Sequence, residues 1–300
     1  MEACQVFSVA LSSVHLENGP ARSRLQLFLS QLSARLLAQR LPESRLGDQA
    51  RPIARHRSPP PFTTRQWPYI TRINAMNTGF RILSCERRVS QSIIARFRAL
   101  PVANVSDAAQ RLNGAGAAMR PMHDGTKLAG TAITVRCRPG DNLMVHKALD
   151  LAQPGDVVVV DAGGDLTNAI IGGLMSAYAE HRGLAGIVIN GAVRDASELR
   201  RGSFPVFACG VTHRGPYKDG PGEINVPVSI GGMVVSPGDL VLGDDDGVIA
   251  VGFDDVEELL SKAETKFRQE AEQMIAIREG RNSRQWVDET LRRLGCIVPA

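Results

Sequence analysis

Hydrophobic and polar positions follow two different periods between residues 90 and 211. Short, unbroken apolar runs predict buried strands, because a strand covered on both faces of a parallel sheet has little polar surface. These runs are Leu128–Arg138, Val157–Val160 and Ala185–Asn190. Three other segments have apolar residues spaced as in a helix, and one lies before each predicted strand or between two of them. They are Ser90–Leu100, Asp141–Gln153 and Leu174–Arg182. The alternation of helix and strand is typical of an α/β domain.

The pattern changes after residue 211. Residues Val226 to Val251 are rich in β-strand pattern, and the three aspartates Asp244–Asp246 before Gly247 predict a hairpin turn rather than a metal site. Asp254–Arg278 then predicts a long amphipathic helix, and Gln285–Leu294 a last one. The apolar stripe of the long helix predicts packing against the domain or a neighbouring subunit.

A charged pair follows the strand predicted at Ala185–Asn190. Arg194 and Asp195 come just after its carboxyl end, and this edge of an α/β sheet is where ligands bind. An arginine offers a fork for a carboxylate, and an aspartate offers hard oxygen ligands for a divalent cation. The alternatives are a surface ion pair or a helix N-cap by Asp195.

A glycine pair precedes the helix predicted at Leu174–Arg182. Gly172 and Gly173 place the start of that helix at about Gly173, and Gly183 ends it. Free N–H groups of Gly173, Leu174 and Met175 would then face the same edge as Arg194 and help to bind a small carboxylate. The alternative is that the two glycines only allow close packing of helix on strand.

Six pieces of the chain, in order, resemble the regulator of ribonuclease E activity A-like (RraA-like) family, which includes 4-hydroxy-4-methyl-2-oxoglutarate aldolases and the related 4-carboxy-4-hydroxy-2-oxoadipate aldolases. They are Val105–Ala108, Gly130–Ala132, Asp156–Gly164, Gly172–Met175, Gly186–Asp195 and Pro237–Val248. The resemblance implies a swivelling β/β/α domain, similar to phosphohistidine domains, that assembles as a homotrimer or hexamer. It also implies a divalent-metal-dependent lyase, of the class II aldolase or oxaloacetate decarboxylase type, that releases pyruvate.

The resemblance also implies roles for individual residues. Arg194 corresponds to the arginine that holds the pyruvyl carboxylate, and Asp195 to the carboxylate that ligates Mg²⁺ (or Mn²⁺). Gly172 to Met175 match a loop whose backbone amides bind the substrate. The metal would polarise the 2-oxo group and stabilise the enolate. A lysine Schiff base is less attractive, because none of the five lysines lies in an apolar strand that would lower its pKa.

One position departs from the aldolase pattern. That pattern has an aspartate twenty-one residues before the Arg-Asp pair, and this chain has Gly173 there. The loss puts efficient retro-aldol turnover in doubt, whereas carboxylate and metal binding remain possible. Oxaloacetate decarboxylation is therefore the less demanding activity. Glu198 is a candidate for a supporting carboxylate on the same helical face, against the alternative of an ordinary solvated glutamate.

A non-catalytic role is the competing hypothesis. Some members of the resembled family regulate a ribonuclease or helicase by binding it through their surface. Retention of Arg194, Asp195 and the glycine loop favours the enzyme, whereas Gly173 favours the regulator. The partners expected for the enzyme are a small 2-oxo acid and further copies of the chain, with no nucleic acid and no membrane.

Charge is distributed unevenly. Residues 1–75 hold ten arginines, no lysine and four acidic residues, whereas the remainder holds 25 basic and 27 acidic residues. The front quarter also has a proline run and no strand pattern, which predicts a disordered basic extension over 1–75 and a lyase domain with C-terminal helices over 76–300. An Arg-rich helical stretch at Ser23–Leu41 is typical of a transit peptide, and the alternative is an extension upstream of a true start at Met76.

Five widely spaced cysteines and the lack of a long apolar run predict a cytoplasmic protein with free thiols. The six histidines show no ligand spacing, so a zinc site is not expected, and His146 is predicted to be a surface or packing residue of a helix.

Overall fold

The computed structural model describes residues 78–297 of the 300-residue chain. The predictions for the first 75 residues, namely the disordered extension and the transit-like stretch at Ser23–Leu41, lie outside the described residues. The described part begins just before the first strand, β1, at Phe80.

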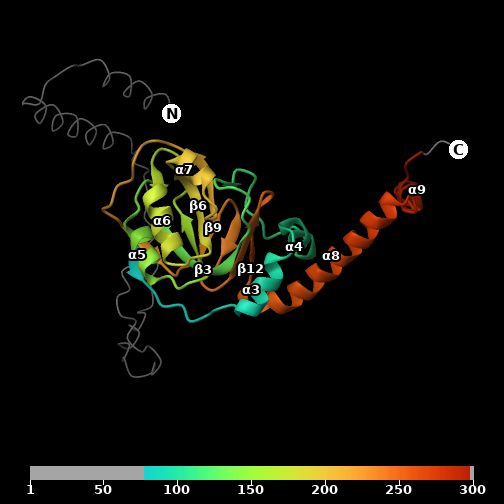
Figure 1. The fold of residues 1–300 in the computed structure, drawn as a ribbon, viewed down its shortest axis with the longest axis horizontal. Helices are drawn as coiled ribbons and strands as arrows, with labels where there is room; N and C mark the ends of the chain where they lie inside the picture. Colours follow the sequence, from blue (N-terminus) through green and yellow to red (C-terminus); the bar gives the residue numbers. More distant parts are fainter. Residues whose placement is uncertain (1–77, 298–300) are drawn as a thin grey trace, which may run out of the picture. The chain divides into compact units, whose positions relative to one another are not determined.

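A mixed sheet forms the centre of the fold (Figure 1). Its main path runs β1-β8-β3-β4-β6-β7-β2, with β11 paired to β3 and β12, and β5 paired to β6. The strands are β1 (Phe80–Ile82), β2 (Arg120–Pro121), β3 (Leu128–Cys137), β4 (Asp156–Asp161), β5 (Ala169–Ile171), β6 (Gly186–Val193), β7 (Val206–Val211), β8 (Gly222–Ile224), β11 (Leu240–Asp244) and β12 (Gly247–Val251). A second, two-stranded sheet contains β9 (Val228–Ile230) and β10 (Met233–Val235).

The parallel core of the sheet is β3-β4-β6-β7, which confirms the strands predicted from the apolar runs. β6 continues to Val193, three residues beyond the predicted end. The reason is a change of partner, because β4 pairs with the first part of β6 and β5 pairs with Ala192 and Val193. β6 therefore has neighbours along both edges up to the residue before Arg194.

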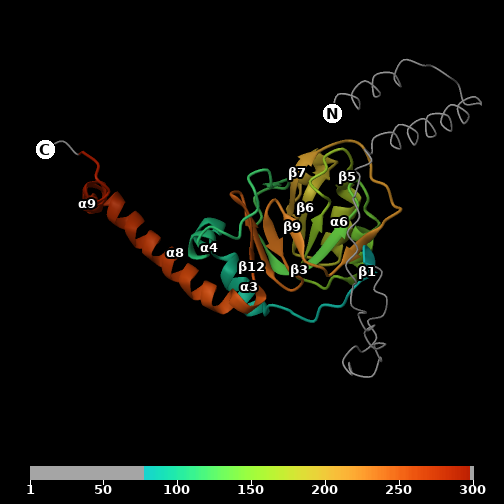
Figure 2. The same ribbon diagram turned by 180° about the vertical axis from the view of Figure 1, so that it is seen from behind.

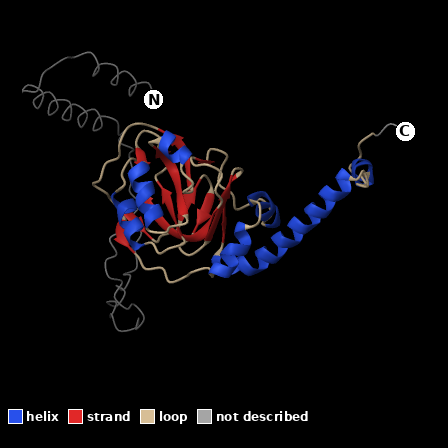
Figure 3. Ribbon diagram, in the orientation of Figure 1, coloured by secondary structure: helices blue, strands red, loops and turns tan. Residues whose placement is uncertain are grey.

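The helices divide between two regions, as Figure 3 shows in blue. They are α3 (Gln91–Arg98), α4 (Val102–Ala108), α5 (Leu143–Leu151), α6 (Gly173–His181), α7 (Ala196–Arg201), α8 (Val256–Arg278), α9 (Gln285–Arg293) and a 3-10 turn at Phe253–Asp255. Helices α5, α6 and α7 share one hydrophobic core with β3, β4, β6 and β7. Helices α3, α4 and the first part of α8 share another with β11 and β12.

The opposite face of the central strands packs against the small sheet. Val157, Val159 and Val188 of the parallel core are fully buried there with β9, β10 and β12. The layers are thus helices, central sheet and small sheet, which confirms the α/β class. None of the helices within residues 78–297 has the length and apolar character needed to cross a membrane.

The hairpin and the two C-terminal helices form as predicted, and the predicted packing of the long helix against the domain is confirmed only for its first part. β11 and β12 form the expected hairpin, with Asp244 opposite Gly247. α8 buries its first part, up to Ala263, and leaves Phe267, Met274 and Ile277 exposed. Figures 1 and 2 both show α8 continuing past the sheet to α9.

The buried residue Glu223 forms ion pairs that connect the first strand, β1, to the rest of the sheet. Glu223 of β8 is 0 % exposed and lies between two arginines. Its Oε1 is 2.7 Å from Nε of Arg81 in β1, and its Oε2 pairs with Arg136 of β3. Because a buried carboxylate without a partner is costly, these contacts hold three neighbouring strands together.

Candidate active site

Arg194 and Asp195 leave the sheet directly after β6, as the sequence predicts. The backbone N–H of Arg194 donates to the carbonyl of Ile171 at 3.0 Å, which continues the pairing of β6 with β5. The two side chains are partly exposed, each to 42 %, so they remain accessible to a ligand while their backbone is anchored in the core.

Asp195 has an unusual backbone conformation. Its φ of 57° and ψ of 35° lie in the left-handed region, which costs free energy for most residues and is tolerated by Asp. Asp195 occupies the N-cap position of α7, but its side chain makes no capping hydrogen bond there. Instead, Oδ2 accepts the N–H of Gly173 at 2.9 Å and lies 3.7 Å from Nε of Arg194. The left-handed turn thus directs the carboxylate to the start of α6.

The hydrogen bond between Gly173 and Asp195 corrects the expectation that the N–H of Gly173 is free. The N–H of Gly173 is not free for substrate, because Asp195 already accepts it. The carboxylate lies at the positive end of the α6 dipole, which stabilises its charge. A Cβ at Gly172 would lie 2.3 Å from Oδ2 of Asp195 and 2.8 Å from Cγ of Arg194. Any side chain at position 172 would therefore clash with Arg194 and Asp195.

Gly173 is crowded by a different acid. A Cβ at Gly173 would lie 2.3 Å from Oε2 of Glu198, the first-turn glutamate of α7. The Glu198 carboxylate thus fills the volume that a side chain at position 173 would need. This places Glu198 beside the predicted site, rather than facing only solvent.

A cavity of about 180 Å³ opens next to these residues. It is smaller than the roughly 300–1,000 Å³ of typical ligand pockets, so it suits a small molecule. Its lining residues are Asn142, His146, Ile170, Ile171, Gly172, Leu174, Met175, Arg194, Pro216 and Lys218. The structure thus brings four predicted residues, Gly172, Leu174, Met175 and Arg194, into one wall. Gly173 and Asp195 are not lining residues: Gly173 donates its N–H to Asp195, and Asp195 lies 3.7 Å from Nε of Arg194.

Two titratable residues of the cavity are not indicated by the sequence. His146 is predicted there only as a surface or packing residue, and Lys218 only as a lysine outside the strands. Burial, followed by the charge of Lys218, lowers the pKa of His146, while Asp150 acts in the opposite direction. Both residues lie far in sequence from Arg194, and neither belongs to a motif. The one signal that could have found Lys218 is that it lies in the loop that follows β7, whereas His146 lies in α5 and has no such signal.

The oxygen atoms near Arg194 fit a hard divalent cation. Mg²⁺ is usually held by one or two carboxylates and keeps several waters, and Asp195 and Glu198 both direct carboxylates to the start of α6. Within residues 78–297 no three His, Cys, Asp or Glu side chains are grouped as a complete metal cage. A cation held by Asp195, with water and substrate as further ligands, agrees with this donor set.

Comparison with known proteins gives the family. Residues 102–250 match the RraA-like family, described as Aldolase/RraA. A protein of Halalkalibacterium halodurans named "Putative 4-hydroxy-4-methyl-2-oxoglutarate aldolase" is 42% identical over 173 residues, which are 58% of this chain and 82% of that protein. The chain belongs to the RraA-like family.

Further relatives of this RraA-like chain carry related names. A 4-hydroxy-4-methyl-2-oxoglutarate aldolase of Thermus thermophilus is 39% identical over 123 residues, covering 41% of this chain and 74% of that protein. A solved structure of Streptomyces coelicolor RraAS2, an unusual member of the RNase ES inhibitor RraA protein family, matches with a TM-score of 0.57 and 28% identity, covering 62% of this chain and 96% of that one. The RraA-like family thus contains proteins named as aldolases and proteins named as ribonuclease inhibitors.

Proposed function

We propose that this chain is a divalent-metal-dependent lyase that acts on small 2-oxo acids and releases pyruvate. The reactions are oxaloacetate decarboxylation, retro-aldol cleavage of 4-hydroxy-4-methyl-2-oxoglutarate-type substrates, or both. One observation carries the proposal: Arg194 and Asp195 pack together on Gly172 beside a small cavity at the start of α6. The names of relatives at about 40% identity support the aldolase part of this proposal.

Arg194 is the group that binds the carboxylate next to the 2-oxo group. Its guanidinium makes charge-assisted hydrogen bonds with a carboxylate, and its backbone is held by β5. Lys218 lines the same cavity and supplies a second positive charge for the carboxylate at the other end of a dicarboxylic substrate. Leu174 and Met175 form the apolar wall between these ends.

Asp195 would hold Mg²⁺ or Mn²⁺, and the Glu198 carboxylate, which crowds the neighbouring Gly173, would support it. A cation held there would supply the positive charge that polarises a 2-oxo group. The hydrogen bond from Gly173 orients the Asp195 carboxylate independently of any ligand.

Decarboxylation is the activity that these residues support best. Loss of CO₂ from oxaloacetate leaves an enolate that only has to take up a proton. Retro-aldol cleavage also requires removal of the substrate's hydroxyl proton, so a base must be positioned nearby. Gly173 offers no side chain for that task, and Glu198 is the carboxylate that occupies its space.

The test is pyruvate release by the full chain from oxaloacetate and from 4-hydroxy-4-methyl-2-oxoglutarate, each with Mg²⁺ and with excess chelator. We expect chelator-sensitive release above the rate with Mg²⁺ alone, faster from oxaloacetate. Asp165→Asn is the control variant, because this partly exposed acid accepts local hydrogen bonds from the backbone N–H and the hydroxyl of Thr167. Rates equal to the protein-free background with both substrates would refute the lyase.

A ribonuclease or helicase regulator is the second candidate, favoured by Gly173 and by the likeness to RraAS2. The chain would then bind its partner through its surface, and Arg194 and Asp195 would not matter. Inhibition of an RNase E-type ribonuclease that is equally strong for wild type and Asp195→Asn would support this candidate.

We also propose that the domain is of the swivelling β/β/α type and assembles as a homotrimer or hexamer. The layers of helices, central sheet and small sheet support the fold type. Exposed apolar side chains, Phe80 and Ile82, on the edge strand β1 support assembly. Light scattering of the purified chain tests the assembly, and a monomer at micromolar concentration would contradict it.

A further inference from the structure

The loop of residues 212–221, which connects β7 to β8, forms one side of the cavity. Pro216 and Lys218 line the cavity directly. The backbone of Gly215 approaches the guanidinium of Arg194 so closely that a Cβ at Gly215 would lie 3.2 Å from Nη1. The loop therefore contacts Arg194 and carries Lys218, the two positively charged residues of the proposed site.

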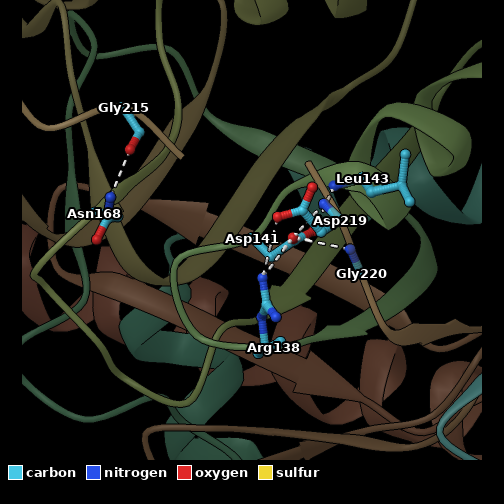
Figure 4. Close-up of polar contacts among 7 residues, drawn as sticks. All are labelled: Arg138, Asp141, Leu143, Asn168, Gly215, Asp219 and Gly220. Atoms are coloured by element: carbon cyan, nitrogen blue, oxygen red, sulfur yellow. Dashed lines mark hydrogen bonds and ion pairs between the residues drawn. The ribbon is translucent and has the colours of Figure 1, made fainter. Parts of the chain in front are cut away.

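The first half of the loop is fixed by the segment before β5. Nδ2 of Asn168 donates to the carbonyl of Gly215 at 2.5 Å (Figure 4). The N–H of Ala169 donates to the carbonyl of Arg214 at 2.8 Å. These contacts hold the backbone that packs against Arg194.

The second half of the loop is fixed by Asp141, which is 0 % exposed. Figure 4 shows its carboxylate surrounded by donors. Oδ2 accepts the N–H groups of Asp219 at 2.7 Å and Gly220 at 2.9 Å, and Nη2 of Arg138 lies 3.2 Å from it. Oδ1 accepts the N–H of Leu143 at 2.9 Å, at the start of α5. These bonds compensate a buried charge that would otherwise be costly.

Two backbone hydrogen bonds beside Asp141 hold the preceding loop residue. The N–H of Tyr217 donates to the carbonyl of Gly140 at 2.8 Å, and the N–H of Asn142 donates to the carbonyl of Tyr217 at 3.0 Å. Lys218 thus lies between two fixed neighbours, Tyr217 and Asp219, whereas its own side chain is exposed at the cavity.

We infer that Asp141 is a positioning residue, which acts through the loop to hold Lys218 at the cavity and so selects substrates with a second carboxylate. The inference rests on the proposed function. Arg194 is held by β5 and β6 and does not need Asp141, whereas the backbone of Lys218 is held on one side by the Asp141 carboxylate. Loss of the carboxylate should therefore weaken binding of the distant acid group and spare the group bound by Arg194.

The experiment compares Asp141→Asn, Lys218→Met and the double variant of the full chain. Two reactions are followed with Mg²⁺: decarboxylation of oxaloacetate, which has two carboxylates, and exchange of the methyl protons of pyruvate in deuterated water, which involves one. Hydrogen-deuterium exchange of the peptide 212–221 reports on the loop without any turnover. Asp156→Asn is the matched control, because this buried acid also accepts a backbone N–H, from Gln153, and pairs with Arg88, away from the loop.

We expect Asp141→Asn and Lys218→Met each to raise KM for oxaloacetate by on the order of tenfold, with little change in pyruvate exchange. The double variant should be no worse than Lys218→Met, since Asp141 acts through Lys218. Amides of 212–221 should exchange faster in Asp141→Asn and not in Asp156→Asn.

Three results would overturn the inference: an unchanged KM in Asp141→Asn, fully additive effects in the double variant, or unchanged exchange of the loop amides. Absence of both reactions in the wild type would refute the proposed function instead, and loop exchange would still decide whether Asp141 positions the loop. Should Asp141→Asn not fold, Arg138→Met removes one of its partners from a partly exposed position and should shift KM and loop exchange in the same direction.

Discussion

The carboxylate of Glu198 occupies the space that a side chain at Gly173 would fill. The two positions therefore cannot vary independently, although they lie on different helices. An acid at position 173 must displace Glu198, whose end is flexible and exposed, and the two negative charges would then repel each other.

Gly173→Asp should therefore be coupled to Glu198→Ala. We expect Glu198→Ala to stabilise the Gly173→Asp protein relative to its effect on the wild type, with a coupling of about 0.5–3 kcal/mol. Thermal or urea unfolding of the wild type, both single variants and the double variant measures it. Effects that add within about 0.5 kcal/mol would show that the two side chains do not meet.

Asp195→Asn should abolish metal-dependent pyruvate release while the fold is kept. The amide keeps one oxygen that can accept the Gly173 N–H, but it lacks the charge that holds a cation. Titration with Mn²⁺, followed by electron paramagnetic resonance, should show weaker binding. Unchanged turnover in a variant with a normal circular dichroism spectrum would contradict the role of Asp195.

Arg194→Ala should chiefly weaken substrate binding. It removes a charge-assisted contact worth about 1.5–3 kcal/mol, which corresponds to a rise in KM of roughly 10- to 150-fold. Arg200→Ala, in the exposed last turn of α7, is the control and should leave KM unchanged. A KM for Arg194→Ala within twofold of wild type would remove Arg194 from the site.

Lys218→Met should raise the pKa of His146. Burial is the first cause of the lowered pKa and the charge of Lys218 the second, so removing that charge moves the pKa upward toward 6.5. An NMR titration of the histidine ring measures it, and Lys147→Met, on the same helix as His146, should have less effect. A downward shift, or none, would mean that Lys218 does not face His146.

The lowered pKa of His146 also makes the stability of the folded chain depend on pH. Because the pKa of His146 is lower in the folded chain than in the unfolded one, protonation favours unfolding. The contribution of His146 to stability is full above pH 6.5 and is lost as the pH falls toward the folded value.

Cys137 should resist alkylation in the folded chain. Burial, then the charges of Asp141 and Asp161, raises its pKa to about 12, so at pH 8 only about one thiol in ten thousand is ionised. Cys296 is exposed and should react with iodoacetamide first. Mass spectrometry of digested peptides distinguishes the two, and rapid labelling of Cys137 before unfolding would disprove the burial.

The parts of the site that depend on local sequence pattern could be predicted from the sequence alone. The apolar run before Arg194 predicts a buried strand, and the end of that strand places Arg194 and Asp195 at the edge of the sheet. Gly172 and Gly173 likewise predict the start of α6. Helix and strand periods are local properties, so these inferences require no knowledge of distant contacts.

The rest of the site depends on contacts between distant segments. Lys218 lines the cavity on the loop after β7, which hydrogen bonds to the distant residues Asp141 and Asn168 hold. The N-cap alternative for Asp195 was right for its position and wrong for its side chain, because the left-handed backbone turns the carboxylate toward Gly173. No local pattern indicates either feature.

The ion pair between Arg81 and Glu223 sets a limit on how far the chain can be shortened. A truncated chain that starts after Ile82 would lack β1 and leave Glu223, at the centre of three strands, with Arg136 alone. Any minimal version of this domain for crystallisation or directed evolution should therefore begin before Phe80, even though residues 102–250 contain the whole stretch that matches the family.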